Sequence, residues 1–159
     1  MSEKKHWVVN PFISLNSGDD RLASWKELRR SLADLDEADA LARVAEYWGC
    51  APVSNFSYNP EMPEDWPSAW EMVSRGEWCR NMLAVAIEFT LRLAGWDASR
   101  LKLIYLRDYD ISEELLILKI DDKYALNYSV GQVVDYPQTE QVITGIWQFD
   151  HKDYVSRPY

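Results

Sequence analysis

Residues 78–94 constrain the fold more than any other segment, because their middle is apolar on nearly every face. Gly95 follows directly and is placed to end a helix. A surface helix keeps one polar face, whereas a helix that is apolar all round is covered by other elements. The sequence therefore predicts a central buried helix over about residues 78–94, with the rest of the chain packed around it.

Two amphipathic helices are expected ahead of this segment. The first is predicted over about residues 20–35, where apolar side chains recur at steps of three and four residues. These side chains are Leu22, Trp25, Leu28, Leu32 and Leu35. The second helix follows Asp36, a residue suited to cap a helix, and ends at Gly49. A shorter helix is expected at residues 68–74, after a loop that contains four prolines.

After Gly95 the sequence becomes typical of β-strands, with many apolar, β-branched and aromatic residues. The pair Asp121-Asp122 lies between two strand candidates and predicts a tight hairpin. The five candidates are residues 101–106, 115–120, 123–128, 132–136 and 142–149. Helices followed by strands indicate an α+β fold, in which N-terminal helices and the central helix pack on a C-terminal antiparallel sheet. We expect one domain over residues 1–159, with its core at about residues 20–150.

The composition narrows the classes of partner. The 159 residues carry 17 basic and 26 acidic side chains, a formal net charge of -9, and an acidic surface repels phosphate. Direct nucleic-acid binding is therefore not expected, although an acidic inhibitor that mimics nucleic acid stays open as an alternative. No apolar stretch reaches the length a bilayer needs, and the first residues lack the apolar core of a signal peptide. We expect a chain of the cytoplasm, or of a phage particle, that is neither secreted nor inserted in a membrane.

The sequence offers no pattern for a cofactor or a metal. Two cysteines and two histidines are spread along the chain without the paired spacing of metal ligands. The acidic residues of the strand region are typical turn formers, and the six glycines form no phosphate-binding loop. No cofactor and no metal are therefore expected.

Cys79 stands at the start of the predicted central helix, a position with a definite chemical meaning. Unpaired backbone N–H groups and the helix dipole favour a thiolate there. A cysteine hydrolase needs that thiolate as nucleophile, a histidine to carry protons, and an acid or amide to orient the histidine. Cys79 is therefore the candidate nucleophile, and a small buried cysteine is the alternative.

Four short segments resemble the transglutaminase-like and papain-like cysteine hydrolase superfamily, and most closely the bacterial transglutaminase-like cysteine proteinases. They are residues 65–72 (DWPSAWEM), 75–84 (RGEWCRNMLA), 91–96 (LRLAGW) and 100–105 (RLKLIY). In that family the cysteine opens the central helix, and its catalytic partners come from the strands that pack against the helix. The resemblance therefore implies the same α+β fold and places Cys79 at the nucleophile position.

The same resemblance implies a degenerate triad. Glu114 falls where the family has its catalytic histidine, although the adjacent Glu113 is one residue away in register. Asn127 falls at the position of the family's aspartate, and Asn81 replaces an acidic residue two positions after the cysteine. A carboxylate beside a thiol disfavours the thiolate, and it cannot carry the positive charge of an imidazolium.

The main hypothesis is accordingly a catalytically inactive protein that binds a protein partner or takes part in assembly. Trp66 and Tyr58 are predicted to form an aromatic binding rim at the old active-site entrance. Compact degenerate members of such folds resemble proteins carried by tailed phages, which implies a structural or host-interaction role. The alternative is a cysteine hydrolase of amide or peptide bonds that uses Cys79 and takes His151 as an unusual base.

Overall fold

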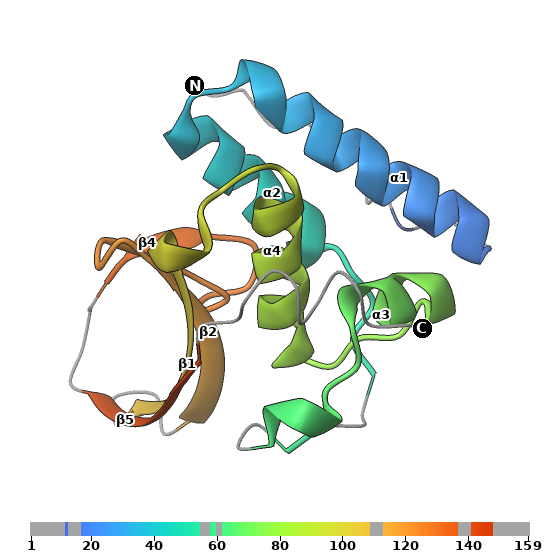
Figure 1. The fold of residues 1–159 in the computed structure, drawn as a ribbon. Coiled ribbons are helices and arrows are strands. Elements are labelled where there is room, and N and C mark those ends of the chain that lie inside the picture. Colours follow the sequence, from blue (N-terminus) through green and yellow to red (C-terminus); the bar gives the residue numbers. More distant parts are fainter. Residues whose placement is uncertain are drawn as a thin grey trace.

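The protein is described by a computed structural model (Figure 1). It describes residues 12, 17–54, 58–59, 62–108, 113–136 and 141–147, with the backbone alone for Asp108, Glu113 and residues 141–147. The α-helices of these residues are α1 (Gly18–Ser31), α2 (Glu37–Gly49), α3 (Ala69–Arg75) and α4 (Met82–Leu93). The strands are β1 (Leu101–Asp108), β2 (Glu113–Ile120), β3 (Tyr124–Leu126), β4 (Val133–Asp135) and β5 (Gln141–Trp147). Single-turn 3-10 helices lie at Leu32–Asp34, Pro63–Asp65 and Ala98–Arg100.

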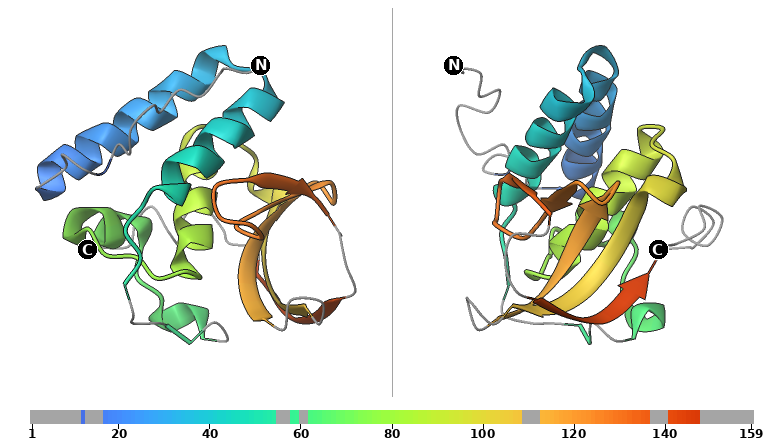
Figure 2. Two further views of the ribbon diagram at one scale, coloured as in Figure 1. Left: turned by 180° about the vertical axis from the view of Figure 1, so that it is seen from behind. Right: turned by 90° about the vertical axis from the view of Figure 1, so that its left-hand side faces the viewer.

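The strands form one antiparallel sheet in the order β4-β3-β2-β1-β5. Figures 1 and 2 show a curved sheet on one side of the molecule and the helices on the other, with α4 between the sheet and the remaining helices. α4 contacts β1 and β2 on one side and α1, α2 and α3 on the other. The predicted α+β fold, with a central helix on a C-terminal antiparallel sheet, is confirmed.

Every residue of α4 from Met82 to Arg92 is buried, as its apolar sequence predicts. The helix begins at Met82, however, and not near residue 78 as predicted. Arg80 and Asn81 form a turn before it, and both side chains bond to the sheet or to the loop beside it. The Cys79 carbonyl already accepts a hydrogen bond from the N–H of Leu83, at 3.2 Å, so Cys79 lies at the edge of the helix.

The helix starts follow the capping residues of the sequence. The Asp36 side chain accepts from the N–H of Asp39, and Ser68 forms a reciprocal capping box with Glu71. Gly76 ends α3 in the left-handed conformation, at φ 75°. The first helix differs from the prediction at both ends: α1 runs from Gly18 to Ser31, and its last turn is replaced by the 3-10 turn Leu32–Asp34.

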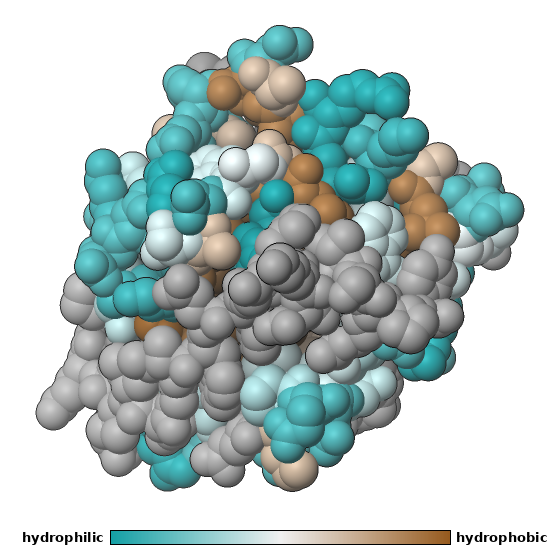
Figure 3. Space-filling view, viewed as in Figure 1, coloured by the Kyte–Doolittle hydropathy of each residue, from teal (hydrophilic) through white to brown (hydrophobic). Residues whose placement is uncertain are grey.

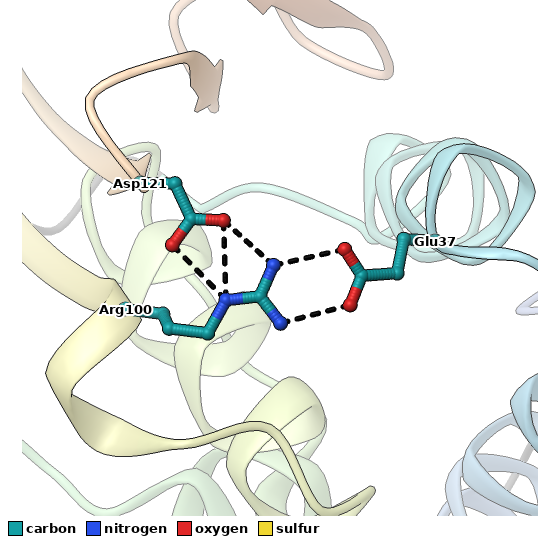
Figure 4. Close-up of polar contacts among 3 residues, drawn as sticks. All are labelled: Glu37, Arg100 and Asp121. Atoms are coloured by element: carbon teal, nitrogen blue, oxygen red, sulfur yellow. Dashed lines mark hydrogen bonds and ion pairs between the residues drawn. The ribbon is translucent and has the colours of Figure 1, made fainter.

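The predicted hairpin at Asp121 and Asp122 is also confirmed. Both residues have positive φ, 58° and 60°, and the N–H of Lys123 donates to the carbonyl of Ile120 at 2.9 Å. The strand register pairs Ile120 with Tyr124, so a three-residue connection, residues 121–123, joins the two strands in a tight hairpin. Arg100 holds this turn to α2, because its guanidinium bonds to Asp121 and, in bidentate form, to Glu37 (Figure 4).

The two faces of the sheet carry two buried clusters. Side chains alternate along each strand, so every second residue lies on the face toward α4. On this face Leu103, Leu116, Leu118 and Ile120 join the main core with the helices. The opposite face carries a second buried cluster, made of Ile104, Leu106, Leu115, Ile117 and Ala125.

Thr90 of α4 connects three parts of the main core. Its hydroxyl donates to the Ala86 carbonyl at 2.7 Å and accepts from the indole N–H of Trp25 at 2.9 Å and of Trp48 at 3.0 Å. One buried hydroxyl therefore fixes the indole orientations of α1 and α2 against the central helix.

On the same helix, Glu88 and Arg92 form a buried ion pair that spans the position of Thr90. The carboxylate Oε2 lies 2.7 Å from the guanidinium, and both side chains are almost entirely shielded from water. Burial raises the pKa of the Glu88 carboxyl to about 7, although the neighbouring Arg92 charge opposes this shift. The Glu88 carboxyl therefore titrates close to neutral pH.

The described part of the surface is mainly hydrophilic on the face seen in Figure 3, where hydrophobic residues show as separate patches. Large apolar side chains that are exposed include Val53, Met62 and Val130. Among the described residues, the helices are too short or too polar to cross a bilayer.

Candidate functional site

The candidate site lies where the chain enters α4. Cys79 is 3% exposed, and neither it nor Cys50 is in a disulfide. The residue before it, Trp78, forms a parallel β-bridge with Val53, and its carbonyl accepts from the N–H of Ser54 at 2.8 Å. Backbone contacts on both sides therefore hold Cys79 in place, since its own carbonyl begins the hydrogen bonding of α4.

Two asparagines fasten this turn to β2 at one residue, Leu116. The Asn81 carbonyl oxygen Oδ1 accepts from the N–H of Leu116 at 3.0 Å, and the Asn127 amide Nδ2 donates to the carbonyl of Leu116 at 3.0 Å. β3 pairs with β2 only over residues 118–120, so Leu116 has no strand partner on that side. The two asparagine side chains thus supply the hydrogen bonds that a neighbouring strand would otherwise give to the N–H and carbonyl of Leu116.

Asn127 uses both hydrogens of its side-chain amide in contacts with the main chain. Its Nδ2 also donates to the carbonyl of Arg80 at 3.1 Å, so both amide hydrogens are used on main-chain oxygens. The residue is 3% exposed and has φ 69°, a left-handed conformation that asparagine tolerates better than most residues. Asn127 therefore connects the turn before α4 to the sheet through its side-chain hydrogen bonds.

Glu114 lies on the face of β2 that carries α4. Leu116, Leu118 and Ile120 are on that face, and the strand period of two adds Glu114 to them and assigns Glu113 to the other. Glu113 therefore lies on the face of β2 away from α4. Its side chain lies beyond the end of the buried row and is 40% exposed.

The Glu114 carboxylate is held by two residues of β1. Tyr105 donates its hydroxyl to Oε1, and Arg107, directly opposite in the ladder, donates to Oε2. These hydrogen bonds, with Tyr105 the larger contributor, lower the pKa of the Glu114 carboxyl below its ordinary value. Glu114 is therefore ionised at neutral pH.

Sequence reasoning missed Tyr105 and Arg107. Both lie on the same face of β1, two residues apart, and Arg107 opposes Glu114 across the hairpin. Charge pairing across strands is a known source of sheet stability, and it would have suggested this register once both strands were predicted.

The aromatic rim is partly contradicted. Trp66 is 3% exposed and donates its indole N–H to the carbonyl of Asn59 at 2.9 Å, so it belongs to the core and not to a rim. A lone tryptophan in a loop has no periodicity from which its burial could be predicted. Tyr58 is half-buried and packs against the core. His151, the candidate base of the alternative hypothesis, lies outside the described residues.

A metal centre finds no support in the part of the chain that the structure describes. Its histidine, cysteine, aspartate and glutamate side chains nowhere gather in a group of three or more that could hold an ion.

A buried helix that begins after a cysteine and packs on an antiparallel sheet, with helices on its other side, defines the transglutaminase-like fold. No protein-family model matches the chain, and no curated protein matches its sequence. Among solved structures, LapG of Legionella pneumophila in a calcium-bound form has a TM-score of 0.64 at 17% identity, covering 83% of this chain and 80% of that one.

LapG treated with EGTA has a TM-score of 0.64 at 18% identity, covering 82% of this chain and 77% of that one. A further LapG structure has a TM-score of 0.63 at 17% identity, over 82% and 79% of the two chains. At these identities the likeness is one of fold.

Proposed function

We propose that this chain is a catalytically inactive protein of the transglutaminase-like fold, which acts by binding a protein partner or in assembly. The observation that carries the proposal is the state of Glu114. At the position where the resemblance has a catalytic histidine, this chain has a carboxylate bonded to Tyr105 and Arg107.

An ionised carboxylate is a poor substitute for histidine at this position. The hydrogen bonds that lower its pKa keep it deprotonated at neutral pH, so it has no proton to give to a leaving amine. Its negative charge also disfavours formation of a thiolate in its vicinity. Glu114 therefore supports neither the acid step nor the activation of Cys79.

Asn127 is assigned to the orienting position by the resemblance alone, and its described hydrogen bonds serve the main chain. Both of its amide hydrogens are donated to main-chain carbonyls, those of Arg80 and Leu116. An orienting residue would have to accept a hydrogen bond from a histidine ring, and no histidine is matched to it in the sequence. The burial of Cys79 adds to these arguments, because a nucleophile must meet its substrate.

A binding role accounts for a scaffold that keeps its fold while its triad positions differ. The acidic character of the chain favours a protein partner over nucleic acid. A structural or host-interaction role in a phage belongs to the same proposal and is supported by the sequence resemblance.

The test is the alkylation rate of Cys79 as a function of pH, in a Cys50→Ala variant. We expect slow alkylation in the folded chain, with a rate that rises only near or above about pH 8.5, the behaviour of an ordinary thiol. The same variant in denaturant gives the rate of the unshielded cysteine, and Cys50→Ala combined with Cys79→Ser gives the background.

A midpoint well below about pH 8.5 would contradict the proposal, because it would reveal an activated nucleophile. Glu114→Gln serves as the matched variant, since it removes the charge and preserves the size of the side chain. If the carboxylate suppresses the thiolate, Glu114→Gln lowers the alkylation midpoint; an unchanged midpoint would remove Glu114 from the argument.

A further inference from the structure

Phe12 occupies an aromatic pocket that adjoins the Cys79 turn. Its ring centroid lies 5.0 Å from that of Tyr47, 6.0 Å from that of Trp48 and 5.4 Å from that of Trp78, the last in an edge-on arrangement. Tyr47 and Trp48 come from the last turns of α2, and Trp78 directly precedes Cys79. Two separate parts of the fold therefore build one pocket around one phenylalanine ring.

The walls and the occupant differ in burial. Tyr47, Trp48 and Trp78 are at most 1% exposed, and Trp48 packs directly on both of the others. Phe12 is only partly buried and lies five residues before Ser17, the N-cap of α1. The pocket is thus part of the rigid core, whereas its occupant comes from outside the helices that form it.

One wall also offers a polar contact. The indole N–H of Trp78 is buried and has no hydrogen-bond partner among the described residues. Buried indole N–H groups usually find an acceptor, and a peptide carbonyl beside an inserted ring would supply one. The pocket therefore combines apolar walls with an unused donor, a combination suited to a peptide segment.

The charge of the N-terminal sequence that contains Phe12 is opposite to that of the rest of the chain. Residues 1–16 contain two lysines and one glutamate, whereas the whole chain has 17 basic and 26 acidic residues. Two carboxylates that water can reach flank the pocket in sequence, Glu46 beside Tyr47 and Glu77 beside Trp78. A basic segment would be attracted to these two carboxylates.

We propose that the pocket of Tyr47, Trp48 and Trp78 is a recognition site for a phenylalanine carried by a basic segment of a partner protein, and that Phe12 occupies it in cis. This inference rests on the proposed binding function and identifies its surface. An aromatic side chain in a desolvated pocket is the usual anchor of a protein interface. Phe12 competes as a tethered ligand, so the partner must displace it.

The first experiment uses the full chain with Phe12→Ala and a labelled peptide of residues 4–16 as the probe. We expect saturable binding to Phe12→Ala, and at least tenfold weaker binding to the wild-type chain because its pocket is filled. A peptide with alanine in place of its phenylalanine should bind at least tenfold more weakly, and added salt should weaken the binding.

Leu22→Ala is the matched control, because Leu22 is a partly buried residue of α1 that packs on the same core. It loosens the helical side without emptying the pocket, so it should not acquire peptide binding. Equal binding by Leu22→Ala and Phe12→Ala would overturn the proposal, since a loosened core would then explain the result.

A Phe12→Ala chain that unfolds cooperatively yet binds no peptide would also overturn the proposal. Should Phe12→Ala fail to fold, Phe12→Leu fills the pocket less completely and is expected to bind the peptide more tightly than wild type does. Absence of that difference would overturn it equally. These outcomes are independent of Cys79 alkylation: a reactive Cys79 would contradict the inactive function and leave peptide binding intact.

Discussion

Two junctions tie the helices to the sheet, and they use opposite physical means. At the start of α4, Asn81 and Asn127 bond to the backbone of Leu116 with neutral groups that are largely shielded from water. At the far end of β2, Arg100 joins Glu37 and Asp121 through charges that are exposed to solvent (Figure 4). The first junction is mostly buried, whereas the second lies in contact with water.

The difference in exposure decides how much each junction contributes to stability. A buried carbonyl that loses its partner carries a desolvation cost of roughly 1–3 kcal/mol. An exposed ion pair contributes at most about 1 kcal/mol, because water and salt screen its charges. The neutral asparagine contacts should therefore outweigh the charged Arg100 contacts, although the latter have more hydrogen bonds.

Asn127→Ala should have the largest effect. It leaves two buried carbonyls without a donor and places alanine at φ 69°, so we expect the free energy of unfolding to fall by about 3–4 kcal/mol. Urea unfolding measures the loss. Asn127→Gly is the control for the backbone conformation and should recover about 1 kcal/mol. A loss below about 1 kcal/mol for Asn127→Ala would contradict the expectation that the asparagine contacts contribute more to stability than the Arg100 contacts do.

Thr90→Val tests another buried polar contact, at constant side-chain shape. The indole N–H groups of Trp25 and Trp48 would lose their shared acceptor, and we expect a loss of about 2–3 kcal/mol. Thr90→Ser retains the hydroxyl and should cost about 1 kcal/mol less. If the two variants are equally stable, the hydroxyl is not what holds the indoles.

Glu88→Gln tests the buried ion pair through its pH dependence. The pKa of Glu88 is raised in the folded state, so its contribution to stability is full below about pH 4.5 and is lost as pH rises through about 7. The stability difference between wild type and Glu88→Gln should change by about 3 kcal/mol across this window, in favour of wild type at low pH. A difference that is constant with pH would show that Glu88 does not titrate there.

Glu37→Gln should have the smallest effect, at most about 1 kcal/mol. The Arg100 hydrogen bonds lower the pKa of Glu37, so its contribution is present above its ordinary pKa and is lost as pH falls further. The difference from wild type should also vanish in about 1 M salt. An effect that equals that of Asn127→Ala would reverse the proposed order of the two junctions.

The helices were predictable because their signals are local. Asp36, Ser68 and Gly76 mark helix ends through contacts within a few residues, and Asp121-Asp122 defines its turn in the same way. The predicted start of α4 was wrong because the side chain of Asn81, a residue compatible with a helix, accepts a hydrogen bond from the backbone of β2. Contacts of this kind depend on register, which the sequence left open at Glu113 and Glu114.

The bonding of the candidate site could not be predicted from the sequence. The resemblance pointed to Glu114 and Asn127, yet only the folded chain gives their partners, Tyr105 and Arg107 for the first and two main-chain carbonyls for the second. The burial of Trp66 was missed for the same reason, since its acceptor is the backbone of a loop residue.

The double donation by Asn127 limits which residues can replace it. An aspartate at this position would present lone pairs to the carbonyls of Arg80 and Leu116, where the amide presents hydrogens. Asn127→Asp should therefore cost more stability than its nearly identical shape suggests, because repulsion between oxygens adds to the loss of two hydrogen bonds. The choice between two side chains of the same outline thus depends on which of them carries hydrogens.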